Sequence, residues 1–396
     1  MPQRLARKAA AYSTNVLIVN VAILLLIFSS FITNYINSSY IEQFVSSEGI
    51  GLMYTIGAAL TILIFLFVSR ILRQVGNYYT VLGLLLLDFC VLIGMAFADS
   101  LRTAVPLFIV HITVVTLIFF NFDIFLEEAI GKKEDSTGSR RGLLLALSSF
   151  VGACTPLFSG YLVGESAAFE RAYYTGALML IPLFAVVMFG FRRIGNPKNH
   201  EVKIIEAIRS FWIEKNIRFV FLSNLLLWFF FCFMVVYTPL YLATEMQFSW
   251  STIGIILFGG QLAYVFFEYP IGRLADKYIG EKEMMIFGFL IISASSALLA
   301  YLTNDSVWLW IIAMFITRMG ASLIEVTTES YFFKHTKGSD GQIISFFRMA
   351  NPLAYIAGPL VVSLALLYVP FNLTFVVLGL CMLSGAVFAL QLTDTK

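Results

Sequence analysis

Charged side chains are scarce in this sequence. Only 13% of its 396 residues are Asp, Glu, Lys or Arg, whereas 59% are hydrophobic. A water-soluble protein cannot bury that much apolar surface, so the composition excludes a soluble globular protein and predicts an integral membrane protein. The formal net charge is only +2, which argues against nucleic acid as a partner.

Residues and motifs that carry chemistry are scarce too. The four cysteines, Cys90, Cys154, Cys232 and Cys381, each lie inside an apolar run without metal-ligand spacing, and we interpret them as inert thiols. The three histidines form no paired motif, and the chain has no Gly-x-x-x-x-Gly-Lys-Ser/Thr loop for ATP. The sequence therefore predicts no metal and no cofactor, and it disfavours an enzyme that acts on lipid.

Long apolar runs, in contrast, are abundant. A helix needs about 20 apolar residues to span a bilayer, and twelve runs reach about that length. They are too long for barrel strands and lack a two-residue alternation, so we predict an all-α protein with twelve transmembrane helices. The first run is too long for a signal-peptide core and is expected to be retained. The approximate spans are 14–36, 49–69, 79–98, 104–126, 142–163, 172–190, 218–240, 251–270, 284–303, 307–329, 342–366 and 372–391.

Lysine and arginine indicate how these spans are oriented. If the N-terminus is cytoplasmic, 22 of the 26 Lys and Arg residues fall inside, and only Arg102 and Arg171 fall in outside loops. Cytoplasmic loops of membrane proteins carry the excess of positive charge. We therefore predict a multi-pass protein of the cell membrane with both termini in the cytoplasm.

The second half of the chain repeats the first. Six sites match at an offset of 203 or 204 residues, which predicts two parallel six-helix bundles, residues 1–190 and 218–396. Residues 191–217 between them show helical spacing of apolar and charged residues. This predicts a cytoplasmic linker with an amphipathic helix on the inner membrane surface, and a solvated linker helix is the alternative. The matched sites are Asn20 and Asn224, Ser46 and Ser249, Ile50-Gly51 and Ile253-Gly254, Gly57 and Gly260, Gly76 and Gly280, and Pro156 and Pro359.

A short polar stretch between the eighth and ninth spans carries a family resemblance. It reads Gly272-Arg273-Leu274-Ala275-Asp276-Lys277, followed by Gly280 and Lys282. We interpret it as a turn, and the string resembles the loop signature of the major facilitator superfamily. That family also has twelve spans, a 6+6 repeat and a long central connection. The first-half copy has decayed, because Arg73 replaces the expected aspartate.

The resemblance implies a monomeric secondary transporter that moves a small-molecule substrate by alternating access. It also implies a conformational gate where the two halves meet in the cytoplasm. There Gly272 would let two backbones approach closely, Arg273 would pair with Glu329, and Asp276 would face the start of span five. Helix-end charges in contact with water are the alternative. The expected gate residues are Gly272, Arg273, Asp276, Lys277, Glu329, Arg140 and Arg141.

In this family, spans one, four, seven and ten line a central cavity. Arg318, near the middle of span ten, is our candidate for a cavity cation, because ionisable groups inside a membrane are expensive to keep. A structural ion pair with a neighbouring carboxylate is the alternative. Polar and aromatic residues around it would suit an amphipathic or weakly polar solute. The expected substrate-binding residues are Arg318, Asn20, Asn224, Trp228, Tyr237, Gln261, Tyr264 and Asn121.

Proton coupling is expected from the other ionisable groups of the spans. His111 in span four is the only histidine inside a span, and histidine can change charge near neutral pH. A hydrogen-bonded packing role is the alternative for it. The remaining candidates are Asp88 in span three, Asp123 in span four and Glu325, which shares a helix face with Arg318.

Span five weakly indicates the direction of transport. Gly142, Pro156 and Gly160 fit the Gly/Pro motif of the family's drug:proton antiporters, whereas Thr155 and Ser159 replace glycines. The motif favours export, although the same residues also suit helix packing. Uptake by the same fold, and a non-transporting membrane receptor or assembly protein, are the alternatives.

Overall fold

The computed structural model describes residues 2–130, 137–194, 213–335, 347 and 349–393. Within these ranges the chain forms helices and turns, and no strand is present, as the sequence predicts. Nine helices of the described part are long and apolar enough to cross a membrane. Three further apolar helical segments there are shorter, namely Gly49–Phe65, Leu147–Val163 and Ala350–Leu366.

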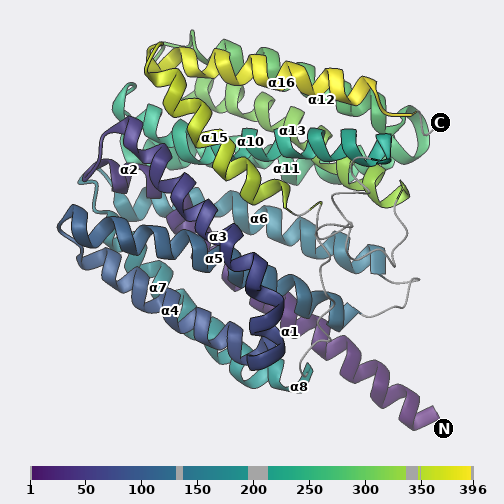
Figure 1. Ribbon diagram of the computed structural model, residues 1–396. Helices are drawn as coiled ribbons and strands as arrows, with labels where there is room; N and C mark the ends of the chain where they lie inside the picture. The colour runs from purple at the N-terminus through teal and green to yellow at the C-terminus, as the bar shows by residue number, and fades with distance from the viewer. Residues whose placement is uncertain (1, 131–136, 195–212, 336–346, 348, 394–396) are drawn as a thin grey trace.

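The first half of the chain supplies the helices drawn from purple to teal in Figure 1. Several run beyond the apolar stretches that predicted them, because backbone hydrogen bonding continues through polar residues at the helix ends. Their bounds are α1 Pro2–Asn34, α2 Asn37–Glu42, α3 Ser47–Val75, α4 Asn77–Phe97, α5 Leu101–Ile130, α6 Thr137–Val163, α7 Phe169–Val186, the π-helical turn η2 Val187–Phe191 and α8 Arg192–Ile194.

The second half supplies the helices drawn from teal to yellow. The linker helix expected in 191–217 falls almost entirely on residues 195–212, outside the described residues. The bounds are α10 Lys215–Thr244, α11 Trp250–Leu274, the π-helical turn η3 Ala275–Ile279, α12 Glu281–Leu299, α13 Val307–His335, α15 Ala350–Leu366, the short η4 Phe371–Leu373 and α16 Thr374–Leu390.

The long helices run roughly side by side, and both chain ends lie at the same end of the molecule (Figure 1). We call this the terminal end, and the opposite end the distal end. Helices α1, α4, α5 and α7 pack together in the first half, and α10, α12, α13 and α16 pack together in the second. Two helix pairs, α6 with α11 and α3 with α15, form the seam between the two groups.

Residues that match between the two chain halves occupy matching places. Gly76 ends α3 with φ 84° and ψ 148°, and Gly280 precedes α12 with φ 95° and ψ 154°. This backbone conformation is essentially restricted to glycine. Gly57 packs on Ile112 of α5, whereas Gly260 packs on Met314 of α13. The offset seen in the sequence therefore corresponds to repeated local geometry.

The polar stretch at 270–280 differs from its predicted form. Instead of a turn, α11 continues to Leu274, η3 extends the helical path to Ile279, and only Gly280 breaks it. The expected close backbone approach at Gly272 is wrong as well. Among the described residues, a Cβ placed there would meet only Val326 Cγ1, at an ordinary 3.8 Å.

Close backbone approach occurs instead at the distal end of the seam. A Cβ on Gly160 of α6 would come within 2.4 Å of the Trp250 carbonyl oxygen and 2.9 Å of Gly254 Cα in α11. At the matching place between α3 and α15, a Cβ on Gly51 would lie 2.8 Å from the Pro359 carbonyl oxygen. Small residues thus close the distal end of the seam by direct backbone packing.

Candidate functional site

Arg318 is a buried cation in the middle of the fold. Its side chain projects from α13 and is 3% exposed. Its Nη1 donates to Thr317 Oγ1 at 3.1 Å and contacts Met314 Sδ at 3.5 Å, and its Cζ lies 5.8 Å from the centre of the Phe230 ring. Among the described residues, no carboxylate lies within ion-pair distance of it. The structural ion pair offered as its alternative role is therefore not found there.

Arg318 faces a polar contact between the two chain halves. The hydroxyls of Tyr35, which follows α1, and Tyr264 of α11 lie within electrostatic range of its guanidinium. Gln261 of α11 donates from Nε2 to the Tyr35 hydroxyl and so links α11 to the first half of the chain. The predicted residues Arg318, Gln261 and Tyr264 therefore do come together, and Tyr35 joins them.

Aromatic rings flank this polar cluster. Trp228 packs edge-on against Phe231 with ring centres 5.4 Å apart, and Phe231 packs against Tyr264 at 6.2 Å. The predicted residue Trp228 is thus connected to Tyr264 through the ring of Phe231. A cation with hydroxyls on one side and rings on the other can hold a solute with one polar and one apolar part.

Of the other predicted substrate residues, three hydrogen-bond to backbone carbonyls of the described chain. Asn224 Nδ2 lies 3.5 Å from the Phe347 carbonyl oxygen, and the Tyr237 hydroxyl donates to the Pro359 carbonyl at 3.3 Å, in the distal seam. Asn121 Nδ2 donates to Leu117 of its own helix at 2.9 Å. Asn20 Oδ1 is buried and has no hydrogen-bond partner among the described residues.

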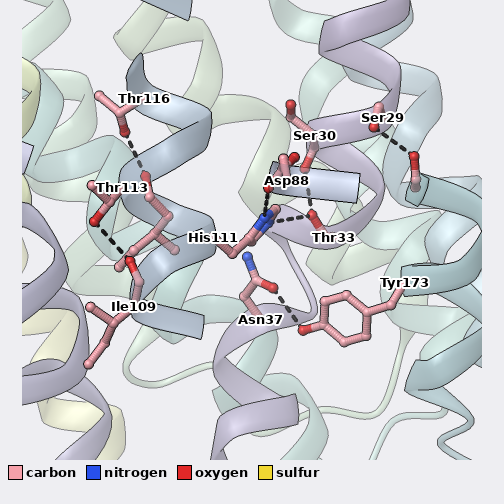
Figure 2. A network of polar contacts seen from close by, with 12 residues as sticks. Ser29, Ser30, Thr33, Asn37, Asp88, Ile109, His111, Thr113, Thr116 and Tyr173 are labelled. Carbon is pink, nitrogen blue, oxygen red and sulfur yellow. Dashed lines mark hydrogen bonds and ion pairs between the residues drawn. The ribbon is translucent and has the colours of Figure 1, made fainter. Parts of the chain in front are cut away.

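A second polar cluster lies within the first half of the chain (Figure 2). His111 Nδ1 of α5 is 2.7 Å from Asp88 Oδ1 of α4, and both side chains are 3% exposed. His111 Nε2 lies 3.3 Å from Thr33 Oγ1 of α1, whose hydroxyl donates to the Ser30 carbonyl at 3.0 Å. Two proton candidates that the sequence treats separately are thus one ion pair.

The hydrogen-bond pattern assigns the protons of this pair. Since the Thr33 hydroxyl proton is used by the Ser30 carbonyl, Thr33 Oγ1 must accept, and His111 Nε2 carries a proton. One more proton then lies between His111 Nδ1 and Asp88 Oδ1. The pair is neutral overall, which is the state that burial favours. Removing or adding one proton would leave a net charge inside the fold.

Glu268 is a site residue that the sequence analysis missed. Both of its carboxylate oxygens lie 3.0 Å from Ser149 Oγ of α6, so this hydrogen bond also crosses the seam. Glu268 lies on α11 beyond Gln261, towards the terminal end. The sequence did carry a signal for Glu268, because it is an ionisable residue within the predicted span 251–270.

The structure describes the side chains of only some residues of the expected cytoplasmic gate, and the gate stays a prediction. Arg273 is exposed and lies over the Tyr269 ring at 6.0 Å, rather than against Glu329. Two candidates for proton coupling lie on α5 and α13. Asp123 is exposed near the end of α5, and Glu325 of α13 is partly buried within electrostatic range of Tyr264. The side chains of Asp276, Lys277, Arg140 and Arg141 lie outside the described residues.

At the terminal end of the second half, a different ion pair is present. Glu281 at the start of α12 is 1% exposed, pairs with Lys334 of α13, and accepts from Ser330 at 2.9 Å. Among the described residues, no group of three His, Cys, Asp or Glu side chains could hold a metal ion. The described fold therefore holds polar clusters at Arg318, at the His111–Asp88 pair, at Ser149–Glu268 and at Glu281–Lys334.

Comparison with known families agrees with this architecture. The model of the Major Facilitator Superfamily matches residues 220–396. The resemblance to the major facilitator superfamily is confirmed. The fold neighbours are transporters, which are not enzymes. No curated protein matches the chain in sequence.

Solved structures share the major facilitator fold over nearly the whole chain. A POT family transporter in complex with a thioalcohol-conjugated peptide has a TM-score of 0.76 at 13% identity, covering 95% of each chain. The nucleoside transporter NupG has a TM-score of 0.75 at 13% identity, covering 95% of this chain and 98% of its own. A POT family transporter with 5-aminolevulinic acid gives 0.75 at 13%, covering 95% of each. At this identity the likeness shows the fold.

Proposed function

We propose that this protein is a secondary active transporter that moves a small organic solute across the cell membrane by alternating access. The observation that carries the proposal is the buried Arg318 at the seam between the two chain halves, which has no carboxylate within ion-pair distance among the described residues. A buried charge without a partner destabilises a fold and is retained where it has a function. The POT family neighbours in complex with a thioalcohol-conjugated peptide and with 5-aminolevulinic acid support a small organic solute.

The proposal includes twelve spans in two six-helix bundles, residues 1–190 and 218–396, joined by 191–217. The nine long and three shorter apolar helices of the described part support it. So do the matched glycines Gly76 at the end of α3 and Gly280 before α12, and the matched backbone contacts at Gly51 and Gly254. Each of these two glycines packs under the proline-containing helix of the other half, α15 and α6 respectively.

Alternating access requires the seam to open at each end in turn. The lysine and arginine distribution places the terminal end in the cytoplasm. Backbone packing at Gly160 and Gly254 then closes the outer side in this conformation. Opening that side requires these contacts, and the Tyr35–Gln261 hydrogen bond, to break. The predicted gate at Asp276, Lys277, Arg140 and Arg141 would act at the inner side.

Proton coupling is proposed at the His111–Asp88 pair. The pair holds one proton between two buried groups. It also contacts Thr33 near the end of α1, and Tyr35 directly follows that helix. A shift of α1 would change the hydrogen bond to Nε2 and with it the affinity of the pair for that proton. Glu268, Asp123 and Glu325 are further carboxylates on seam or cavity helices.

The direction of transport stays a prediction of export. Gly160 and Pro156, which favour export in the sequence, pack against Gly254 in the structure, and this supports their role in helix packing. Accumulation assays in right-side-out and inside-out vesicles decide the direction. An exporter accumulates solute in inside-out vesicles when the vesicle interior is acidified, whereas a proton-driven importer accumulates it in right-side-out vesicles under an inward proton gradient.

The experiment that tests the proposal is reconstitution after a solute screen. Solutes that raise the melting temperature of the purified protein are offered to proteoliposomes, and their entry is followed over time. Flux above that of empty liposomes supports a transporter. Binding without flux would support the receptor alternative and contradict the proposal.

A further inference from the structure

The donors of Arg318 are only partly used. Both of its contacts with described polar atoms, Thr317 Oγ1 and Met314 Sδ, involve Nη1. Thr317 is itself committed, because its hydroxyl donates to the Met314 carbonyl at 2.7 Å. The Nη2 and Nε hydrogens lie along one edge of the planar guanidinium, which matches the two oxygens of a carboxylate. This edge is therefore available for a bidentate anion.

The surroundings of Arg318 supply further donors and few competing anions. Tyr35 accepts a hydrogen bond from Gln261, so its own hydroxyl proton is left to donate. The groups that act electrostatically on Arg318 are Tyr35 and Tyr264, whereas Glu325 and Glu268 act on Tyr264. Tyrosine hydroxyls near a guanidinium favour an oxygen anion over a neutral solute.

The apolar side of the cluster indicates what the rest of the bound solute is like. Phe230 lies under the guanidinium, and the Trp228–Phe231–Tyr264 ring series continues from it along α10 to α11. Rings of this kind favour a flat apolar body next to the anionic group. A fully polar anion would leave these rings without an apolar group to contact.

We infer that the substrate carries a carboxylate or a similar planar anionic group joined to an apolar, ring-sized body, and that Arg318 binds the anionic group through its free edge. The inference rests on the proposed function, because it names the substrate class of the same site. It explains why the fold keeps a buried guanidinium that meets no carboxylate among the described residues. The bound substrate would supply the opposite charge.

The test uses matched acids and amides as probes. Thermal unfolding of the purified full-length protein is measured with benzoate, 3-phenylpropionate, benzamide and 3-phenylpropionamide, at constant ionic strength set with sodium chloride. We expect the acids to raise the melting temperature and the amides to have at least tenfold lower apparent affinity, because an amide lacks the charge. Acids and amides acting equally, or no response to either acid, would overturn the inference.

Variants assign the effect to Arg318. Arg318→Met keeps the length of the side chain, removes the charge, and should abolish the response to the acids. Arg318→Lys keeps the charge without the planar fork and should weaken it about tenfold. Arg102→Gln, at an exposed arginine at the start of α5, is the matched control and should respond like the wild type. An acid response that survives in Arg318→Met would contradict the assignment.

Failure of the inference and failure of the proposed function give different results. If proteoliposomes carry only neutral or cationic solutes, the protein is a transporter and the anionic substrate class is wrong. If the acids bind through Arg318 but no solute crosses the membrane, the site stands and transport is wrong.

Discussion

At the scale of single residues, the buried charges of this fold are handled in two ways. Asp88 and His111 neutralise each other with one shared proton, and Thr33 fixes which ring nitrogen is protonated. Arg318 has no acid among the described residues and rests on a hydroxyl, a sulfur and an aromatic face. A pair of this kind can gain or lose a proton, whereas a lone guanidinium stays charged and can only gain a ligand.

Removal of one member of the pair should distinguish the roles of its two residues. His111→Ala leaves a buried carboxylate without its partner and should lower the free energy of unfolding by about 3–5 kcal/mol. Asp88→Asn leaves two neutral groups that still hydrogen-bond and should cost less, about 1 kcal/mol. Denaturation of the detergent-solubilised variants measures both. Equal losses for the two substitutions would contradict the proton assignment.

Transport separates the same two variants from a structural effect. Asp88→Asn has no carboxylate to exchange the proton, so accumulation driven by a pH gradient should be lost while solute exchange across the membrane continues. Retained gradient-driven accumulation in Asp88→Asn would remove the pair from the coupling mechanism.

At the scale of helices, glycine decides where elements end and where they touch. Gly76 and Gly280 stop helices with a backbone that other residues rarely adopt, whereas Gly160 and Gly254 bring α6 and α11 into backbone contact. Gly272, the glycine that the sequence singles out, has neither a positive φ nor a close neighbour. The position of a glycine in a motif did not reveal its physical role, because that role depends on a partner helix.

Alanine substitutions test this difference at the polar stretch. Gly280→Ala forces a side chain into a strained backbone and should cost about 1–3 kcal/mol of stability. Gly272 lies in α11, where a Cβ would make only an ordinary 3.8 Å contact with a described atom. Gly272→Ala should therefore be neutral or slightly stabilising, because alanine favours a helix. Melting temperatures of the two variants give the comparison. A larger loss for Gly272→Ala would restore the close approach predicted from the sequence.

The distal seam can be tested by adding bulk. Gly160→Leu should push α6 away from α11, because even a Cβ there comes within 2.4 Å of a backbone oxygen. The spin–spin distance between labels at Glu165 and Gln247, both exposed beside the seam, should increase. Gly83→Leu is the matched control, since nothing lies within 4 Å of a Cβ at that position. An unchanged distance in Gly160→Leu would mean that this contact does not hold the seam closed.

At the scale of the whole molecule, the sequence predicts more of the fold than of the site. Apolar runs report bilayer length, which is a property of the chain itself, and they located the helices of the described part. The repeat offsets predict a duplication, and glycines matched by the offset have the same backbone conformation at Gly76 and Gly280. The pairing of His111 with Asp88, the Tyr35–Gln261 link and the Ser149–Glu268 bond each join different helices. Such pairs depend on how helices rotate against each other, and no local pattern encodes that rotation.

The two halves and the cation between them form one mechanism in this account. The seam is closed by small residues at the distal end, and two polar contacts across it, at Gln261 and Glu268, lie nearer the terminal end along α11. A solute bound at Arg318 would contact groups from both halves and would therefore influence which end opens.

The most direct test of this account is flux through the reconstituted protein. The solute selected by thermal stabilisation is followed across proteoliposomes that contain wild type, Arg318→Met or the control Arg102→Gln, with and without a proton gradient. The account predicts gradient-dependent flux for wild type and control and at least a tenfold loss for Arg318→Met, whose insertion into the membrane is unchanged. Equal flux in Arg318→Met and wild type would contradict it.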